Sequence, residues 1–341
     1  MEEVSTIGLD IAKQVFQVHA ASANGAVLFS RKITRARLLG FFASQSPCLV
    51  AMEACGGAHH WAREIAKLGH EVRLIPPAYV KPFVKRQKSD AVDAEAICEA
   101  VQRPNMRFVA VKTEAQQASA LLFRTRDMLV RQRTQIVNAL RGHMMEFGWV
   151  APKGRQHISD LHALIEDPAS ALPPAAQLML QLMLEVLDTL DHRIRDMDKE
   201  ISRRAREDDT ARRLMTIPGV GPITAVALTA LAPPLEGFAK GRDFAAWLGL
   251  TPRQMSTGGK QKLGSITKMG ERTLRRLLII GSTAVVRQSS RPGAAKNAWL
   301  EQMLARKPRM LVAVALANKM ARMIWAVMTR NEDYRAPAIA V

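Results

Sequence analysis

Four carboxylates in the first hundred residues have the types and the spacing of a metal-binding site. Asp10 lies in the apolar run IGLDIAK, and Glu53 lies near the end of the apolar run CLVAMEA. Asp90 and Asp93 are three residues apart in KSDAVDAEAI, a spacing that places both on one face of a helix. Charged groups are costly in apolar strands unless they are paired or bind a metal. At about 4 Å, two carboxylates repel by roughly 4 kcal/mol, so four of them share a pocket only with cations.

Ligands that are all oxygen favour Mg²⁺ or Mn²⁺ over zinc. Two such ions about 4 Å apart would stabilise the entering and departing oxygens of a phosphodiester displacement. The four acids therefore predict phosphoryl transfer. For the helical pair there is an alternative, in which Asp90 is an N-cap and Asp93 interacts with the helix dipole. That alternative does not explain Asp10.

The elements that must position these acids alternate between strand and helix patterns. Three short apolar or β-branched runs at residues 5–12, 15–21 and 26–33 predict a three-stranded meander. The pattern then predicts a helix at 35–44, a buried strand at 48–54, a helix at 59–68, a strand at 71–75, and helices beginning near Ala78 and Asp90. The order βββαβαβα indicates a mixed α/β domain over residues 1–110.

Residues 111–210 are typical of long helices. A first apolar series predicts one helix to about Phe147: Leu121, Leu122, Met128, Leu129, Ile136 and Leu140. A second series follows a Pro-rich loop: Met183, Leu187, Leu190, Ile194, Met197 and Ile201. Its alternating spacings of four and three favour a coiled coil, although an amphipathic helix on its own domain fits too. The two helices could pair within one chain or between two.

The charge balance predicts a polyanionic partner. The chain has 49 Lys and Arg against 31 Asp and Glu, a formal charge of +18. Residues 251–341 contain 17 basic and 4 acidic side chains. Three cysteines without CxxC spacing indicate neither a disulfide framework nor a zinc site. No uncharged apolar run approaches the roughly 20 residues that span a bilayer, so we expect a cytoplasmic protein with no membrane partner.

Residues 211–341 predict a basic, mainly helical domain. In IPGVGPITA, Gly219 and Gly221 flank a turn between two apolar stretches. This resembles a helix-hairpin-helix, in which glycines let backbone N–H groups approach a phosphate; a tight interhelical turn is the alternative. Helices are expected at 244–250 and 273–286, separated by the Gly- and Lys-rich loop TPRQMSTGGKQKLGSITKMG, and a final helix at 308–328.

Nucleic-acid contacts are expected from this domain and from the basic run before Asp90. Lysines in the loop would neutralise a phosphate backbone that the loop glycines allow to come close. A solvated helix face is the alternative for the three arginines. The candidates are Lys85, Arg86, Lys88, Gly219, Gly221, Gly258, Gly259, Lys260, Lys262, Lys268, Arg272, Arg275 and Arg276.

These motifs resemble those of the DEDD insertion-sequence transposases, relatives of the pilin-gene invertase. GLDIAK, AMEACG and KSDAVDAEAI are similar to an N-terminal domain that is itself similar to the RuvC Holliday-junction resolvase, with a ribonuclease H-like fold. IPGVGPITA and AAWLGLTPRQMSTGGKQKLGSITKMGERTLRRLL are similar to the transposase domain. The resemblance covers nearly the whole chain. It implies recombination of donor and target DNA by a homo-oligomer, a dimer or tetramer, guided by a structured bridge RNA.

The resemblance also implies a serine nucleophile that forms a covalent link to DNA, and the matching position is Ser256. A hydroxyl needs a base or a metal to become a nucleophile, and the acids could supply the metal if the domains meet across a protomer interface. Thr257 is an adjacent hydroxyl, so the match could be shifted by one residue. A Ser-Thr-Gly-Gly loop is also ordinary turn chemistry.

Three other functions fit parts of the sequence. A metal-dependent junction nuclease that cuts by water attack needs the acids but not the serine. A non-catalytic nucleic-acid scaffold would use the acids as helix caps. An actin-like sugar kinase is suggested by IGLDIAK, but a second Gly-rich phosphate loop is missing, and a small-molecule enzyme does not need so basic a C-terminal region.

Overall fold

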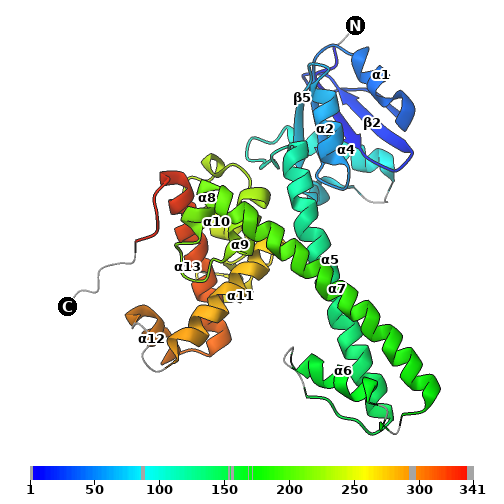
Figure 1. The fold of residues 1–341 in the computed structure, drawn as a ribbon. Coiled ribbons are helices and arrows are strands. Elements are labelled where there is room, and N and C mark those ends of the chain that lie inside the picture. Colours follow the sequence, from blue (N-terminus) through cyan, green and yellow to red (C-terminus); the bar gives the residue numbers. More distant parts are fainter. Residues whose placement is uncertain are drawn as a thin grey trace. The chain divides into compact units, whose positions relative to one another are not determined.

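The computed structural model describes residues 3–85, 89–152, 154, 157–167, 169–170, 172–291 and 297–335. The chain divides into two compact units, residues 1–115 and 116–341, and each is described by itself (Figure 1). The boundary lies close to residue 110, where the sequence pattern changes from mixed α/β to long helices. A further division of the second unit near residue 210 stays a prediction.

The first unit is built around a five-stranded mixed sheet. Its strands are β1 (Thr6–Asp10), β2 (Val15–Ala21), β3 (Val27–Thr34), β4 (Leu49–Glu53) and β5 (Glu71–Ile75). The spatial order is β3-β2-β1-β4-β5; β1, β2 and β3 form an antiparallel meander, and β4 and β5 continue parallel to β1. The predicted order βββαβαβα is confirmed.

Successive side chains of β1 point to opposite faces of the sheet, and different helices cover the two faces. Ile7 and Leu9 are fully buried on the face covered by α1 (Leu38–Ala43) and α2 (Ala58–Ala66). Gly8 faces α4 (Asp90–Val101), and a Cβ added there would lie 2.2 Å from the carbonyl oxygen of Ala94. Glycine therefore lets α4 rest directly on the strand. The remaining short helical turns are η1 (Arg35–Arg37), α3 (Pro77–Val80) and η2 (Lys81–Phe83).

Two long helices, α5 (Glu114–Glu146) and α7 (Pro174–Glu207), lie side by side (Figure 1). The short α6 (Ile158–Glu166) comes between them in the chain. Arg126 pairs with Asp198 at 2.5 Å and Arg133 with Asp191 at 3.0 Å, so the two helices run antiparallel. The sequence left open whether they pair within one chain or between two, and they pair within one chain.

The predicted apolar series forms most of the contact surface of these helices. Leu187, Leu190, Ile194 and Ile201 of α7 are buried, as is Leu140 of α5. The half-buried positions are Leu122, Leu129, Ile136, Met183 and Met197. Leu121 and Met128 are exposed and do not belong to this surface.

The rest of the second unit packs around one helical core. Its helices are α8 (Asp209–Leu214), α9 (Pro222–Leu231), η4 (Leu235–Gly237), α10 (Gly241–Trp247), α11 (Arg272–Ser289), α12 (Ala298–Leu304) and α13 (Arg309–Arg330). Among the described residues, α13 is the one helix long and apolar enough to cross a membrane. Leu316, Met320 and Ile324 of α13 are, however, buried in this core.

The segment between α10 and α11, expected to be a loop, contains a β-hairpin. Its strands are β6 (Pro252–Gln254) and β7 (Leu263–Ile266), which pair antiparallel. At the tip, Gly258 (φ 53°) and Gly259 (φ 77°) take left-handed conformations, and the Lys260 N–H donates to the Thr257 carbonyl at 3.0 Å. Two positive φ angles in succession make a two-residue hairpin turn, and this turn signal was overlooked in the Gly-Gly pair.

Candidate functional site

The four predicted acids come from three elements that meet at one edge of the sheet. Leu9 of β1 lies opposite Met52 of parallel β4, so Asp10 and Glu53 end neighbouring strands on the same side. Because Asp10 follows Gly8 by two residues, its side chain lies on the face that α4 covers. Asp90 and Asp93 lie in the first turn of α4.

The charge of the other three acids acts on Asp10. The pKa of Asp10 is raised from its ordinary 3.8 to about 6, mainly by burial and then by the charges of Asp93, Asp90 and Glu53, in that order. A hydrogen bond with the Ile11 backbone acts in the opposite direction. Glu53, Asp90 and Asp93 therefore all lie within electrostatic reach of Asp10.

Helix α4 is capped by Ser89 rather than by Asp90. Ser89 has extended backbone angles (φ −150°, ψ 152°), and its Oγ accepts a hydrogen bond from the Val92 N–H at 3.4 Å. The alternative in which Asp90 is the N-cap is wrong. Asp90 is exposed and Asp93 is half-buried, so neither acid is needed to cap the helix, although both interact favourably with its dipole.

The donor set suits a hard divalent cation, because it consists of carboxylate oxygens. Asp10, Glu53, Asp90 and Asp93 are the residues that would hold the ion. Within the described part of the chain, no three carboxylate, imidazole or thiol groups are close enough to hold a metal as they are placed. Binding an ion would therefore require these side chains to turn toward one another.

A cavity of about 260 Å³ lies where the chain leaves β1 and β4, and its lining includes two cationic residues that are not among the predicted contacts. It is lined by Ile11, Ala12, Lys13, Arg35, Gly56, Gly57 and Trp61. The Arg35 guanidinium lies 5.0 Å from the centre of the Trp61 ring and donates to the Lys13 carbonyl at 3.2 Å. Lys13 was visible in GLDIAK, three residues after Asp10. Arg35 was not, because only the return of the meander brings it to this edge.

Ser256 lies in the second unit, exposed on the hairpin between β6 and the Gly258–Gly259 turn. Its Oγ accepts a hydrogen bond from the Lys262 N–H at 3.3 Å. A backbone N–H cannot take a proton from the hydroxyl, so a base or metal from outside this hydrogen bond must activate it. Thr257 is equally exposed, and the geometry of the turn does not distinguish the two hydroxyls.

The predicted basic contacts around the hairpin divide into two groups. Lys260, Lys262, Lys268 and Arg272 are exposed. Arg275 is buried, and its guanidinium donates to the carbonyls of Leu248 (3.0 Å) and Met269 (2.8 Å); burial lowers its pKa. The expected nucleic-acid contact of Arg275 is therefore corrected to a structural role, in which it holds the base of the hairpin.

Two further predicted cations form ion pairs. Arg276 pairs with Asp127 of α5, and Lys85 pairs with Glu95 of α4 at 2.5 Å. Arg86 and Lys88 lie outside the described residues. Of the basic run before Asp90, Lys85 is therefore the cation that the structure locates, and it remains exposed.

The two glycines of the GVGP turn have different surroundings. Gly219 has φ 88°, and a Cβ there would lie 2.8 Å from Val285 Cγ2 and 2.9 Å from the Gly281 carbonyl of α11. Its missing side chain serves packing within the protein, and the expected approach of a phosphate to the backbone at Gly219 stays a prediction. Gly221 precedes α9, is exposed, and has open space where a Cβ would be.

Comparison with known proteins agrees with this arrangement. Residues 7–148 match a DEDD transposase family model, and residues 211–297 match the model of the transposase IS116/IS110/IS902 family. A Pseudomonas aeruginosa protein described as "Probable family 20 transposase" is 49% identical over 337 residues, which cover 97% of this chain and 99% of that protein.

Two named element transposases are also similar over their whole length. The transposase for insertion sequence element IS1328 of Yersinia enterocolitica is 41% identical over 331 residues, covering 97% of this chain and 98% of the relative. That of IS1111A from Coxiella burnetii is 38% identical over 339 residues, covering 99% and 93%. The chain therefore belongs to the IS116/IS110/IS902 family of insertion-sequence transposases.

Proposed function

We propose that this transposase is a site-specific DNA recombinase that combines an acidic metal site with a serine nucleophile. One observation carries the proposal: Asp10 and Glu53 end neighbouring parallel strands on the face covered by the first turn of α4. A mixed sheet with this strand order is also compatible with the ribonuclease H-like fold that the resemblance implies. Four like charges at one edge contribute nothing to packing, but they form a ligand set for Mg²⁺ or Mn²⁺.

The acids would hold one or two divalent ions, which when bound stabilise the negative charge that develops in phosphodiester displacement. Other residues of this chain would contact the phosphates of the substrate. Lys13 and Arg35, in the cavity of about 260 Å³, offset the repulsion between the acids and the phosphates of an approaching strand. The Trp61 ring keeps the Arg35 guanidinium in place.

Ser256 is the proposed nucleophile. Its Oγ attacks phosphorus and loses its proton, the phosphorus–oxygen bond to the departing sugar oxygen breaks, and that oxygen takes up a proton. The product is a serine–phosphate diester that keeps the energy of the broken bond. Attack by the departing hydroxyl of another strand reverses the step and releases Ser256, so rejoining requires no energy-rich cofactor.

The partners follow from the same proposal. Donor and target DNA are the substrates, and a structured bridge RNA selects them, as the family resemblance implies. The exposed cations Lys260, Lys262, Lys268 and Arg272 supply phosphate contacts beside Ser256. The active form is a homo-oligomer, a dimer or tetramer, that works in the cytoplasm.

Trapping the covalent intermediate tests the serine. Wild-type protein, Ser256→Ala and Thr257→Ala are incubated with Mg²⁺, guide RNA and DNA carrying the element ends, and the products are denatured in detergent. We expect a protein–DNA adduct from the wild type and from Thr257→Ala, and none from Ser256→Ala. If Ser256→Ala still cuts DNA fully and no adduct forms with any protein, the chemistry is the water attack of a junction nuclease.

Removing single acids tests the metal site and the scaffold alternative. Asp10→Asn and Asp93→Asn should abolish recombination in cells, because each removes a ligand from the proposed site. Both variants should still bind guide RNA, measured by gel shift. Normal recombination by both would establish that the acids are dispensable, as a non-catalytic scaffold requires.

A further inference from the structure

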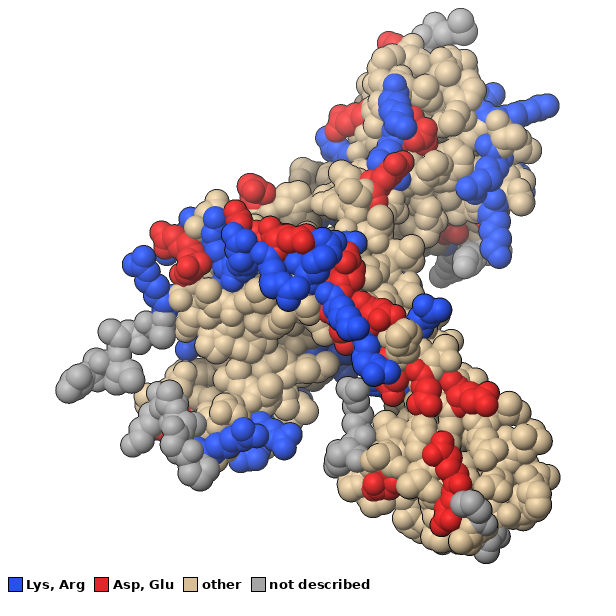
Figure 2. Space-filling view, in the orientation of Figure 1, with Lys and Arg blue, Asp and Glu red and all other residues tan. Residues whose placement is uncertain are grey.

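A surface of uncompensated positive charge lies at the end of α11 that is remote from the hairpin. There the C-terminus of α11 meets the N-terminus of α13, since Arg309 donates to Ser290 Oγ at 3.1 Å. We call this surface the basic patch; its residues are Arg287, Arg291, Arg306, Lys307 and Arg309. All five are exposed, and Figure 2 shows a group of basic side chains where these helices end.

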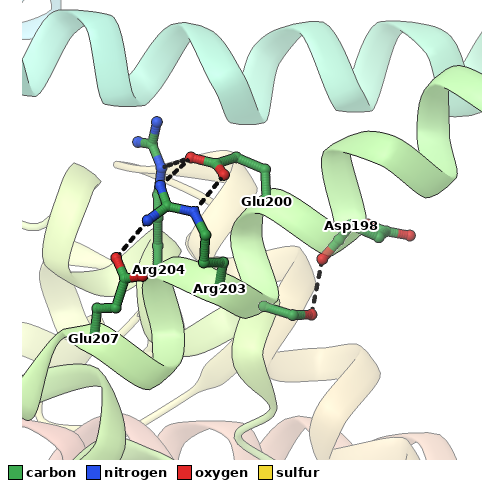
Figure 3. A network of polar contacts seen from close by, with 6 residues as sticks. Asp198, Glu200, Arg203, Arg204 and Glu207 are labelled. Atoms are coloured by element: carbon green, nitrogen blue, oxygen red, sulfur yellow. Dashed lines mark hydrogen bonds and ion pairs between the residues drawn. The ribbon is translucent and has the colours of Figure 1, made fainter.

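On α7, by contrast, basic side chains are balanced by acids. Along α7, Figure 2 shows both signs mixed, and Figure 3 shows the pairing in detail. Arg203 bridges Glu200 and Glu207 at 2.8 and 2.5 Å, and Arg204 pairs with Glu200 at 2.7 Å. These pairs lower the pKa of Glu200. Charges balanced in this way need no external partner.

The basic patch has no such balance. Residues 272–330 contain twelve Lys and Arg but one acid, Glu301. In the described part of the chain, no acidic side chain lies within ion-pair distance of any of the five patch cations. Mutual repulsion among them opposes folding, so an ordinary solvated face does not explain why the five are gathered.

Their position relative to α13 increases the repulsion. Arg309 is the first residue of α13, Arg306 and Lys307 precede its N-cap Pro308, and the first turn of the helix contains no acid. A helix N-terminus carries a partial positive charge, so cations placed there destabilise the free protein. A bound anion would be attracted by the three side chains and by the helix dipole together.

We propose that the basic patch binds the phosphate backbone of duplex DNA outside the reacting site. DNA is the substrate class of transposases, and a contact to backbone needs charge rather than base recognition. Arg287 lies fifteen residues after Arg272, which is about 22 Å along the helix at about 1.5 Å per residue. That is about six base pairs of duplex, so the patch and the hairpin contact different phosphates. The patch holds flanking DNA while the hairpin meets the strand that reacts.

The salt dependence of DNA binding distinguishes a localised contact at the basic patch from a general effect of net charge. The patch variant is Arg306→Gln/Lys307→Gln/Arg309→Gln, and Arg287→Gln/Arg291→Gln is a second, independent one. The control is Lys199→Gln/Arg203→Gln/Arg212→Gln, which removes the same charge from cations that are paired with acids. Full-length proteins bind a fluorescent 30-base-pair duplex in chelator, and anisotropy is followed over about 50 to 300 mM salt.

For the patch triple variant, we expect the slope of log affinity against log salt to fall by about 2 to 3. Affinity at 100 mM salt should fall about ten- to hundred-fold, whereas the control changes affinity by less than about two-fold. Because the patch residues are exposed and repel one another, the melting temperatures of the patch variants should equal or slightly exceed that of the wild type. The test uses neither the acids nor the serine, because binding is measured in chelator and without cleavage.

Three results would overturn the proposal. Equal losses in patch and control variants would mean that only net charge matters. Loss of binding to duplex RNA of the same length, with DNA binding unchanged, would assign the patch to RNA. Loss of binding to vesicles of anionic phospholipid, with DNA binding unchanged, would assign it to a membrane surface. None of these results would bear on the proposed cleavage chemistry.

Discussion

At the scale of single residues, Asp10 occupies a position that disfavours the ionised form of its carboxyl group. It is partly buried at the end of a strand, and three other carboxylates act on it, so its pKa is raised to about 6. The folded protein therefore binds a proton at Asp10 more tightly than the unfolded chain does. Without a cation, stability is lost as pH rises from about 4 to about 6, and the loss is complete above pH 6.

Replacement of Asp10 by Asn should therefore stabilise the protein in chelator at neutral pH. We expect a gain of about 1 to 2 kcal/mol at pH 7.5, allowing for partial exposure, and no gain near about pH 3, where Asp10 is protonated in both states. Thermal melts between about pH 3 and pH 8 measure it. Mg²⁺ should raise the melting temperature of the wild type and not that of the variant.

Glu64 provides a control of opposite sign. A hydrogen bond from Lys67 lowers the pKa of this exposed carboxyl, so Glu64→Gln should weaken the protein slightly at neutral pH and have no effect in acid. If Asp10→Asn and Glu64→Gln both increased stability at pH 7.5, removal of any negative charge would stabilise the first unit. The local repulsion inferred at Asp10 would then be refuted.

At the scale of elements, the contact of α4 with β1 determines whether the acids meet. Gly8→Ala should push α4 away, because its Cβ would lie 2.2 Å from the Ala94 carbonyl oxygen. We expect a loss of about 1 to 3 kcal/mol or more in the free energy of unfolding, and loss of Mg²⁺-dependent stabilisation. Gly40→Ala in α1 has open space around its Cβ and should be neutral or slightly stabilising. Equal effects of the two changes would contradict this account.

The hairpin that carries Ser256 depends on Arg275. Arg275→Met would leave the Leu248 and Met269 carbonyls without their guanidinium donor, at a cost of about 1 to 3 kcal/mol for the buried Leu248 carbonyl. Hydrogen exchange should accelerate at residues 249–270 while α11 stays protected. Arg272→Met, one turn earlier and exposed, is the control. Unchanged exchange in Arg275→Met would remove the structural role assigned here.

Local patterns in the sequence predicted most of the elements. Apolar alternation and near-continuous runs found the five strands, and the apolar series found α5 and α7. The acids were predicted because an Asp in an apolar strand is conspicuous. Arg275 was misassigned because charge alone cannot distinguish an exposed arginine from one that holds two carbonyls. The packing of Gly219 was not predicted either, because its partner, Gly281, is sixty-two residues further along the chain, and sequence spacing does not reveal such a contact.

At the scale of the whole molecule, the proposed metal ligands and most of the excess positive charge lie in different parts of the chain. The proposed metal ligands all lie in residues 1–115, whereas residues 251–341 contain 17 basic against 4 acidic side chains. The sheet and its covering helices form their own buried clusters from residues of the first unit alone. Metal binding and most DNA attraction are therefore assigned to parts of the chain with separate cores.

A fragment of residues 1–115 should consequently fold on its own. Its core contains fully buried side chains on both faces of the sheet, including Ile7, Leu9 and Phe16 on one face and Ile75 on the other, enough for a domain of this size. We expect a cooperative thermal transition by circular dichroism and stabilisation by Mg²⁺ that Asp10→Asn abolishes. DNA affinity should fall at least about ten-fold relative to the full chain, because the fragment lacks the basic C-terminal region. A fragment without a cooperative transition would show that the acids depend on the second unit for their positions.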